Sequence, residues 1–330
     1  MSTPERARPG RLSGLGLLIC CPLLFAAGSG LAVAQENTAD DWAFPARLAE
    51  KSLLLDMDTT GQQAIAVGER GHVLVSTNGG ESWTQAAVPT RRMLCAVDIV
   101  DENLVWVAGH DAIILHSRDG GQNWSRQYYA PEVEAPLFDI WFENSQHGIA
   151  VGAYGLFLET FDGGHNWQSR SLSDEGPHHF ALAESPAGIL YLAGEFGTIF
   201  TSTDQGRSWQ ICNSPYHGSF FGVLVLRDES VLVFGLRGNL YRSTDHGNSW
   251  QQIDTGTTAA LTAGAQRTDG TVIIVGLSGC LLTSSDGGLT FNLATRPGRD
   301  AMAAIHESAA NRLVILGEDG LHWWEVLARE

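Results

Sequence analysis

Residues 160–167 read TFDGGHNW, and closely similar octapeptides begin at Ser76, Ser117, Ser202, Ser243 and Ser284. Their shared pattern is Ser/Thr-x-Asp-x-Gly-x-(Ser/Thr/Asn)-Trp, and the final aromatic residues lie 41 to 43 positions apart. The third position holds Asn78, Asp119, Asp162, Asp204, Asp245 and Asp286, and the last holds Trp83, Trp124, Trp167, Trp209, Trp250 and Phe291. A repeat of this length is typical of β-propeller blades.

The sequence between octapeptides reads as short strands, most clearly in the third repeat. Apolar runs at residues 137–143, 148–152, 155–160 and 167–172 are rich in Val, Ile, Leu and Phe and are separated by Gly, Asn or Asp turns. Four strands in a unit of about 42 residues match one propeller blade. We therefore expect an all-β propeller, without helices after the N-terminal region.

The octapeptide resembles the Asp-box of the bacterial-neuraminidase repeat proteins. Its residue types suit a tight hairpin between the third and fourth strands of a blade. Asp and Ser/Thr side chains can hydrogen-bond turn amides, Gly supplies positive φ, and Trp packs under the turn. Because this Asp recurs from repeat to repeat, with Asn78 as its one replacement, we interpret these residues as structural rather than catalytic.

The spacing predicts seven blades rather than six. A seventh apolar-Gly pair, Leu316-Gly317, continues the series that precedes each octapeptide. At the other end, Trp42 lies 41 residues before Trp83 and 11 residues before Leu53. We therefore expect residues 42–49 to form the outer strand of blade seven, so that both chain ends close the ring and leave no free edge.

The N-terminal region has the features of an export signal. Three arginines within residues 6–11 precede an apolar run at residues 12–27, and Ala32-Val33-Ala34 is a small-x-small cleavage site. We expect residues 1–34 to be a signal peptide and residues 35–330 to be one exported propeller, periplasmic or, in a phototroph, lumenal. An uncleaved anchor is the less favoured alternative. No later apolar stretch approaches the roughly 20 residues that cross a bilayer.

Composition excludes several functions. The formal net charge of −17 argues against nucleic-acid binding, which needs a basic surface. Cys95, Cys212 and Cys280 are too few and too far apart for a disulfide framework, and the chain has no CxxC or HExxH metal motif. We interpret all three as buried apolar residues and expect no cofactor and no metal.

The inner strands carry small residues at a matching position, namely Ala96, Ala181, Gly222, Ala263 and Ala304. Asp139 stands at the same position, and Asp56 and Asp98 appear one residue from it. A ring of carboxylates around a channel could bind a cation. A solvated channel lining is the favoured interpretation.

Residues 137–167 resemble the photosystem II stability/assembly factor family, whose hallmarks are an Asp-Val-x-Phe type strand, Gly-x-x-Val-Gly-x-x-Gly and then the octapeptide. The resemblance is weaker in the inner strands of blades five to seven. It implies a non-catalytic exported propeller that docks on a membrane-protein complex and assists its assembly or stability. The source need not be a phototroph, and the complex could be another one, such as a transporter.

The alternative function is a glycoside hydrolase of sialidase type, which the Asp-boxes alone suggest. Such enzymes need three substrate-binding arginines, a tyrosine nucleophile and an acid/base Asp. The chain lacks their Arg-Ile-Pro type motif, and a Gly-x-Ser-x-Gly elbow is also missing. We therefore expect no enzyme activity.

Topology predicts where a partner would bind. Turns between second and third strands share one face with the connections between blades, whereas the octapeptides occupy the other face. Arg and Tyr are favoured at the centres of protein interfaces. On the first face we expect Arg70, Arg91, Arg92, Tyr128, Tyr129, Tyr154, Tyr216, Arg237, Arg296 and Arg299 to contact the partner, although exposed turns also carry such residues without function.

Overall fold

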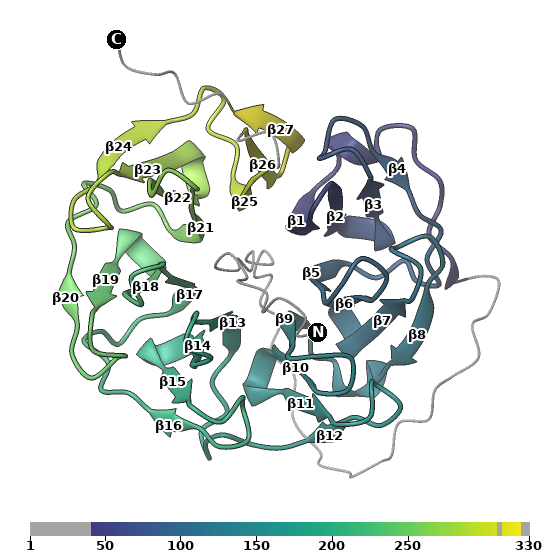
Figure 1. Cartoon of the computed structure of the whole chain (residues 1–330), viewed down its shortest axis with the longest axis horizontal. Coiled ribbons are helices and arrows are strands. Elements are labelled where there is room, and N and C mark those ends of the chain that lie inside the picture. The colour runs from purple at the N-terminus through teal and green to yellow at the C-terminus, as the bar shows by residue number, and fades with distance from the viewer. Residues whose placement is uncertain (1–40, 309–311, 325–330) are drawn as a thin grey trace, which may run out of the picture.

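Seven antiparallel sheets surround a central axis in the computed structural model, which describes residues 41–308 and 312–324 (Figure 1). Six sheets have four strands and the seventh has three. The expected all-β seven-bladed propeller is therefore confirmed. The predicted signal peptide, residues 1–34, lies outside the described residues.

Each blade is an up-and-down sheet whose strands follow chain order from the axis outward. The inner strands are β1 (Leu54–Thr60), β5 (Leu94–Ile99), β9 (Leu137–Phe142), β13 (His179–Glu184), β17 (Phe220–Val225), β21 (Leu261–Gln266) and β25 (Met302–Glu307). The second strands are β2 (Gln63–Gly68), β6 (Val105–Gly109), β10 (Gly148–Gly152), β14 (Leu190–Gly194), β18 (Val231–Gly235), β22 (Val272–Gly276) and β26 (Leu313–Gly317).

The third and fourth strands complete the blades. The third strands are β3 (Val73–Ser76), β7 (Ile113–Ser117), β11 (Phe157–Thr160), β15 (Ile199–Ser202), β19 (Leu240–Ser243), β23 (Cys280–Ser284) and β27 (Gly320–Trp324). The outer strands are β4 (Thr84–Gln85), β8 (Ser125–Tyr128), β12 (Gln168–Ser169), β16 (Gln210–Ile211), β20 (Gln251–Gln252) and β24 (Asn292–Thr295).

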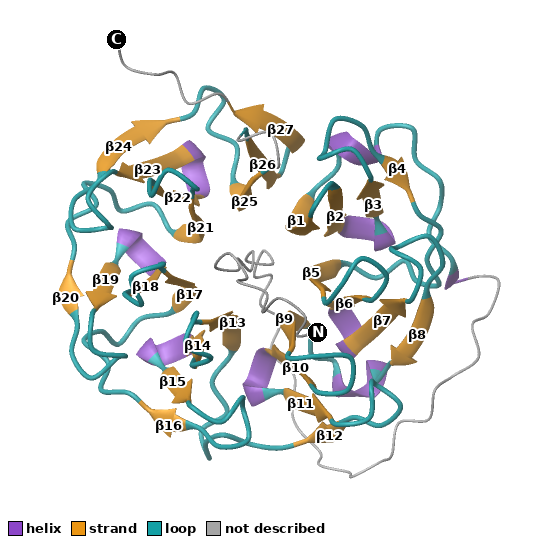
Figure 2. Cartoon of the chain, in the orientation of Figure 1, coloured by secondary structure: helices purple, strands orange, loops and turns teal. Residues whose placement is uncertain are grey.

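The helical segments of the described part are single 3₁₀ turns, drawn in purple in Figure 2. Six of them join second and third strands: η3 (Glu69–Gly71), η4 (His110–Ala112), η6 (Ala153–Gly155), η7 (Glu195–Gly197), η8 (Leu236–Gly238) and η9 (Leu277–Gly279). The other two are η2 (Ala49–Lys51) and η5 (Pro131–Val133). Within residues 41–308 and 312–324, no helix is long and apolar enough to cross a membrane.

The octapeptides form the turns between third and fourth strands, and side chains close each turn. In blade four, Ser202 Oγ donates to Asp204 Oδ1 at 2.8 Å and accepts from Gly206 N at 2.8 Å. Asp204 Oδ1 also accepts from Ser208 N at 2.8 Å. The bond from the glycine amide to the first hydroxyl recurs in all six octapeptides at 2.8 to 3.0 Å. These hydrogen bonds explain why the turn needs its Ser/Thr and its Asp. The φ of 85° at Gly206 explains the Gly, because other residues rarely adopt that conformation.

Residues 42–49 do not form the outer strand that we expected in blade seven. In the described residues that sheet ends at β27, and Trp42–Ala49 contains no strand. Ala43 N instead donates to Val88 O at 3.0 Å, which places this segment beside blade one. The turn η2, at the end of this segment, contacts β27 of blade seven, and Ala49 and Trp323 belong to one apolar cluster. Spacing alone suggested the wrong partner, because it does not record which backbone groups the segment meets.

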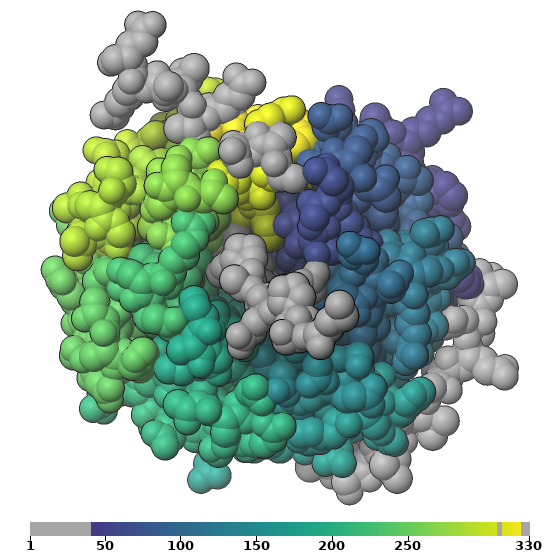
Figure 3. Space-filling model, in the orientation of Figure 1, coloured from purple at the N-terminus to yellow at the C-terminus, as the bar shows by residue number. Residues whose placement is uncertain are grey.

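Neighbouring blades pack closely around the ring in the space-filling view (Figure 3), and apolar side chains fill the space between their sheets. Side chains from the second position of the inner strands also meet near the axis. Phe180 lies 5.4 Å from Phe138 and 5.3 Å from Phe221, measured between ring centroids, so the contact spans blades three to five. Leu55, Cys95 and Ala303 form a matching cluster in blades one, two and seven. In blade six the equivalent residue is Thr262, whose hydroxyl donates to Met302 O at 2.6 Å. These buried contacts near the axis were not predicted from the sequence.

Candidate functional site

One face of the disc is built from the six 3₁₀ turns between second and third strands and from the connections that lead to the next blade. We call it the turn face. Hydrogen bonds join the two kinds of loop, for example Ala112 N to Ala135 O at 2.9 Å and Arg296 N to Gly279 O at 2.8 Å. The octapeptides and the turns between first and second strands form the opposite face, which we call the octapeptide face.

In six of the seven blades, the turn face presents a residue in an uncommon backbone conformation at the middle of a 3₁₀ turn. The middle residue of each 3₁₀ turn has φ between 56° and 59°, the left-handed region that favours Gly and Asn. These residues are Arg70, Asp111, Tyr154, Phe196, Arg237 and Ser278. All except Asp111 are exposed. Five of these residues lie within a Gly-x-x-Gly sequence, whereas Ala112 replaces the second Gly beside Asp111, so this signal marks the set incompletely.

Several predicted arginines already have partners within the chain. Arg92 forms an ion pair with Asp111 at 2.8 Å, and its hydrogen bond to the Tyr129 hydroxyl is the main cause that raises the pKa of Arg92. Arg296 makes two hydrogen bonds to Asp319, at 3.2 and 2.9 Å. Both guanidinium groups therefore form contacts between loops of this chain, and binding a partner would have to compete with those contacts.

Arg91 holds the segment that precedes blade one. Its Nε donates to Trp42 O at 2.8 Å, and its guanidinium lies 3.9 Å from the centroid of the Phe44 ring. A charge reversal at Arg91 would therefore disturb the N-terminal segment as well as the surface. Arg91 and Arg92 are poor positions for testing a docking surface.

Arg70, Arg237 and Arg299 remain at the surface. The Arg70 side chain is 79% exposed and lies 3.7 Å from the carboxylate of its neighbour Glu69. Arg237 and Arg299 are also exposed, and both have positive φ. Of the predicted arginines, these three are the most accessible to a partner.

The predicted tyrosines fall into two groups. Tyr128 is half-buried against the core between blades two and three, and Tyr129 against the core between blades one and two. Burial raises the pKa of Tyr128. Tyr216 is half-buried as well, with its ring 6.1 Å from that of Tyr241. Tyr154 differs, because it is 55% exposed. Packing between blades accounts for the first three, and only Tyr154 projects from the turn face as we expected of all four.

The inner-strand carboxylates hold neighbouring blades together. Asp56 Oδ2 accepts from Val97 N at 2.9 Å, and Asp139 Oδ2 accepts from Leu182 N at 2.6 Å, so each bond crosses to the next blade. The prediction that Asp56 lies one residue away from the position of Asp139 was wrong. A bulge follows the first residue of these strands, and the pairing then places Asp56 and Asp139 at the same position. Asp98 lies two residues further along its strand, opposite Trp106, and accepts from the backbone of blade three.

From the sequence, the inner-strand carboxylates could either bind a cation or line a solvated channel. The carboxylates bond to backbone N–H groups, and the described residues contain no group of three or more His, Cys, Asp or Glu arranged to hold a metal ion. Cys95 and Cys280 are buried and Cys212 is half-buried, and burial raises the pKa of Cys95 to about 12. The geometry thus assigns the carboxylates to the contacts between blades.

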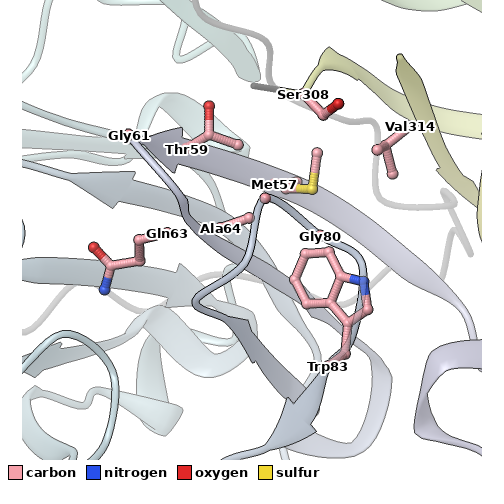
Figure 4. Close-up of a pocket in the computed structure, with 10 residues that line it drawn as sticks. Met57, Thr59, Gly61, Gln63, Ala64, Gly80, Trp83, Ser308 and Val314 are labelled. Carbon is pink, nitrogen blue, oxygen red and sulfur yellow. The ribbon is translucent and has the colours of Figure 1, made fainter. Parts of the chain in front are cut away.

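A small pocket opens at the seam between blades one and seven (Figure 4). Met57 and Trp83 contribute from blade one, and Ser308 and Val314 from blade seven. None of the residues that line it has a side chain that titrates near neutral pH. The hydroxyls of Thr59 and Ser308 in this lining therefore have no acid or base beside them within the pocket.

Comparison with known proteins identifies the family. A family model described as "Photosynthesis system II assembly factor YCF48" matches residues 34–132 and 127–270. The chain is 26% identical over 157 residues to the photosystem II assembly lipoprotein Ycf48 of Synechococcus sp. (strain CC9902), covering 46% of this chain and 47% of that protein. It is 23% identical over 145 residues to the chloroplastic photosystem II stability/assembly factor HCF136 of Oryza sativa subsp. japonica, covering 42% and 35%. The matched stretches thus span less than half of either relative.

A solved structure described as "YCF48 bound to D1 peptide" superimposes with a TM-score of 0.70 at 21% identity, covering 85% of this chain and 95% of the other. At this identity the superposition supports the seven-bladed fold. The model and the relatives are described as assembly or stability factors rather than as enzymes, in agreement with our expectation of no enzyme activity. Because the family model matches well over half of the sequence, the chain belongs to the photosystem II assembly factor YCF48 family.

Proposed function

We propose that this protein is a non-catalytic assembly factor that docks through its turn face on the exported part of a membrane-protein complex or its assembly intermediate. Membership of the assembly-factor family supports this function, and one observation favours the turn face. Five of its six 3₁₀ turns expose the side chain of their middle residue, held on a rigid blade. In a phototroph, the complex would be photosystem II.

Two further features belong to this proposal. We infer that the octapeptides act as Asp-boxes with a structural role, since their Asp and Ser/Thr side chains are engaged within the turn. We also infer export after cleavage behind Ala34, which would place the turn face on the periplasmic or lumenal side. N-terminal sequencing of the exported protein should then begin at Gln35, and an intact Met1 would overturn this inference.

The docking face can be tested with two serines of blade six. Ser278 is exposed on the turn face, and Ser285 is exposed in the octapeptide on the opposite face. A photoreactive phenylalanine analogue would replace either serine in the full chain, and membranes of the source organism would be irradiated. Mass spectrometry should identify subunits of one complex cross-linked to position 278 and not to position 285.

Two outcomes of the cross-linking at positions 278 and 285 would contradict the proposal. Cross-links from position 285 alone would place the docking surface on the octapeptide face. Absence of cross-links to any membrane protein from both positions, in cells that contain the complex, would contradict docking itself. Melting temperatures of the two substituted proteins would show whether both fold equally well.

A further inference from the structure

Two large aromatic side chains project from neighbouring blades of the turn face. Tyr154 is 55% exposed and Phe196 is 63% exposed, and both occupy the middle of a 3₁₀ turn. The equivalent positions in the other blades carry charged or small polar residues, among them Ser278. The aromatic pair is therefore a feature of blades three and four and not of the repeat.

Folding stability does not explain these aromatic residues. Tyr154 and Phe196 both have φ of 56°, a conformation that a bulky side chain adopts at a cost of about 1 kcal/mol or more. More than half of each side chain is exposed, so much of the apolar surface of each ring stays in water. Gly or Asn would fit the same turn at a lower cost. A residue that is locally unfavourable and exposed points to a role in binding.

His178 fixes the position of the pair. Its Nδ1 accepts from Tyr154 N at 2.8 Å, and its ring centroid lies 4.8 Å from that of Tyr154. Its Nε2 lies 3.7 Å from Glu195 Oε2, and Glu195 directly precedes Phe196. The same ring contacts Phe180 at 5.9 Å between centroids. The two exposed rings thus stand on turns that a buried aromatic cluster supports.

The charges around the pair are negative. The connection after blade three carries the exposed residues Asp174 and Glu175, and Gly176 of this connection lies directly against Gly155 in the Tyr154 turn. Glu195 adds a third carboxylate. Residues 171–178, 195–197 and 212–219 contain no Lys or Arg. Exposed aromatic rings flanked by carboxylates favour a cation, because ring faces and carboxylates both attract positive charge.

We propose that Tyr154, Phe196 and the carboxylates of Asp174 and Glu175 form a docking site for an extended segment of the partner that carries Arg or Lys beside an apolar residue. This inference rests on the proposed docking through the turn face and adds the chemistry of the partner. Arg or Lys would lie against a ring and reach a carboxylate, and the apolar neighbour would cover the second ring. An acidic segment would be repelled here.

A peptide pair tests the chemistry. The first probe is a capped, fluorescently labelled octapeptide of alternating Arg and Phe, and the second replaces each Arg with Glu. Fluorescence anisotropy with the full chain at physiological salt should show at least about tenfold tighter binding of the basic peptide. Tyr154→Ser combined with Phe196→Ser should weaken that binding by about tenfold, since exposed aromatic anchors commonly dominate such sites.

A matched control separates this site from the general negative charge of the protein. Asp174→Lys with Glu175→Lys should abolish the preference for the basic peptide. Glu81→Lys with Glu102→Lys changes the net charge equally, but on the octapeptide face, and should alter binding by less than about threefold. Unchanged melting temperatures would show that each variant folds, as expected for exposed positions.

The outcomes distinguish this inference from the proposed function. Any of three results would overturn the proposed site. The first is equal affinity for the two peptides, and the second is an equal loss of affinity for the basic peptide in the two double Lys variants. The third is an unchanged affinity of the double Ser variant for the basic peptide. If position 278 still cross-links to a membrane complex, docking through the turn face stands without this site. If the basic peptide binds as predicted but neither serine position cross-links, the site stands and the assembly role fails.

Discussion

The hydroxyl of Ser202 is almost completely buried, yet it makes three hydrogen bonds within one octapeptide. It donates to Asp204 and accepts from the backbone N–H groups of Asp204 and Gly206. Such short-range bonds depend only on residues a few positions apart, which is why the octapeptide turn could be predicted from the sequence. The turn-face residues differ, because Tyr and Arg have no intrinsic preference for the positive φ that Tyr154 and Arg237 adopt.

Removal of this hydroxyl should have a measurable cost. Ser202→Ala leaves the buried Gly206 N–H without its acceptor, so we expect the free energy of unfolding to fall by about 2 kcal/mol. Thr203→Ala, at the exposed neighbouring position, should change it by less than about 0.5 kcal/mol. Urea denaturation of both variants measures the difference. Equal stabilities would show that the octapeptide bonds do not hold the turn.

Acid should weaken the same turns. Hydrogen bonds from the Ser208 side chain and backbone lower the pKa of Asp204 to about 2. A carboxyl whose pKa is lower in the folded state stabilises the fold above its unfolded pKa of about 3.9, and this contribution is lost as pH falls through the folded value. Asp204→Asn cannot titrate, and Asn78 shows that an amide fits this turn. The variant should therefore lose less stability than the wild type between pH 4 and pH 2, as urea melts at each pH would show. Parallel pH profiles would contradict this assignment.

The strands were largely predictable because each blade repeats the same alternation of apolar runs and turns. Blade three illustrates this, since β9 to β11 begin and end within two residues of the expected runs, whereas the outer strand β12 is shorter than expected. The segment Trp42–Ala49 was placed wrongly because its spacing from Trp83 said nothing about its hydrogen bonds. The position of Asp56 was also misjudged, since a bulge cannot be read from composition. Errors therefore arose where contacts between distant segments decide the structure.

The bond between Asp139 and blade four should support the ring of inner strands. Asp139→Ala removes the acceptor of the buried Leu182 N–H, and we expect the free energy of unfolding to fall by about 1–3 kcal/mol. Asp139→Asn, which keeps one carbonyl acceptor, should lose less. Thermal denaturation followed by circular dichroism gives both values. An Ala variant as stable as the wild type would rule out a stabilising role for this contact.

At the scale of the whole molecule, the two faces of the disc expose different kinds of loop. The octapeptide face engages its polar side chains in its own turns, whereas the turn face exposes Arg70, Tyr154, Phe196 and Arg237. The sequence predicted the separation of the faces from strand order alone. It did not predict that Arg92 and Arg296 are engaged by Asp111 and Asp319, because those pairs depend on contacts between loops of different blades.

Hydrogen–deuterium exchange of the protein, alone and bound to its membrane complex, tests docking through the turn face most directly. Binding should slow exchange in turn-face segments such as residues 152–156 and 194–198, because a partner excludes water from the amides that it covers. Exchange in the octapeptides at residues 160–167 and 202–209 of the same two blades should remain unchanged. Protection of the octapeptides without protection of the turns would contradict the account.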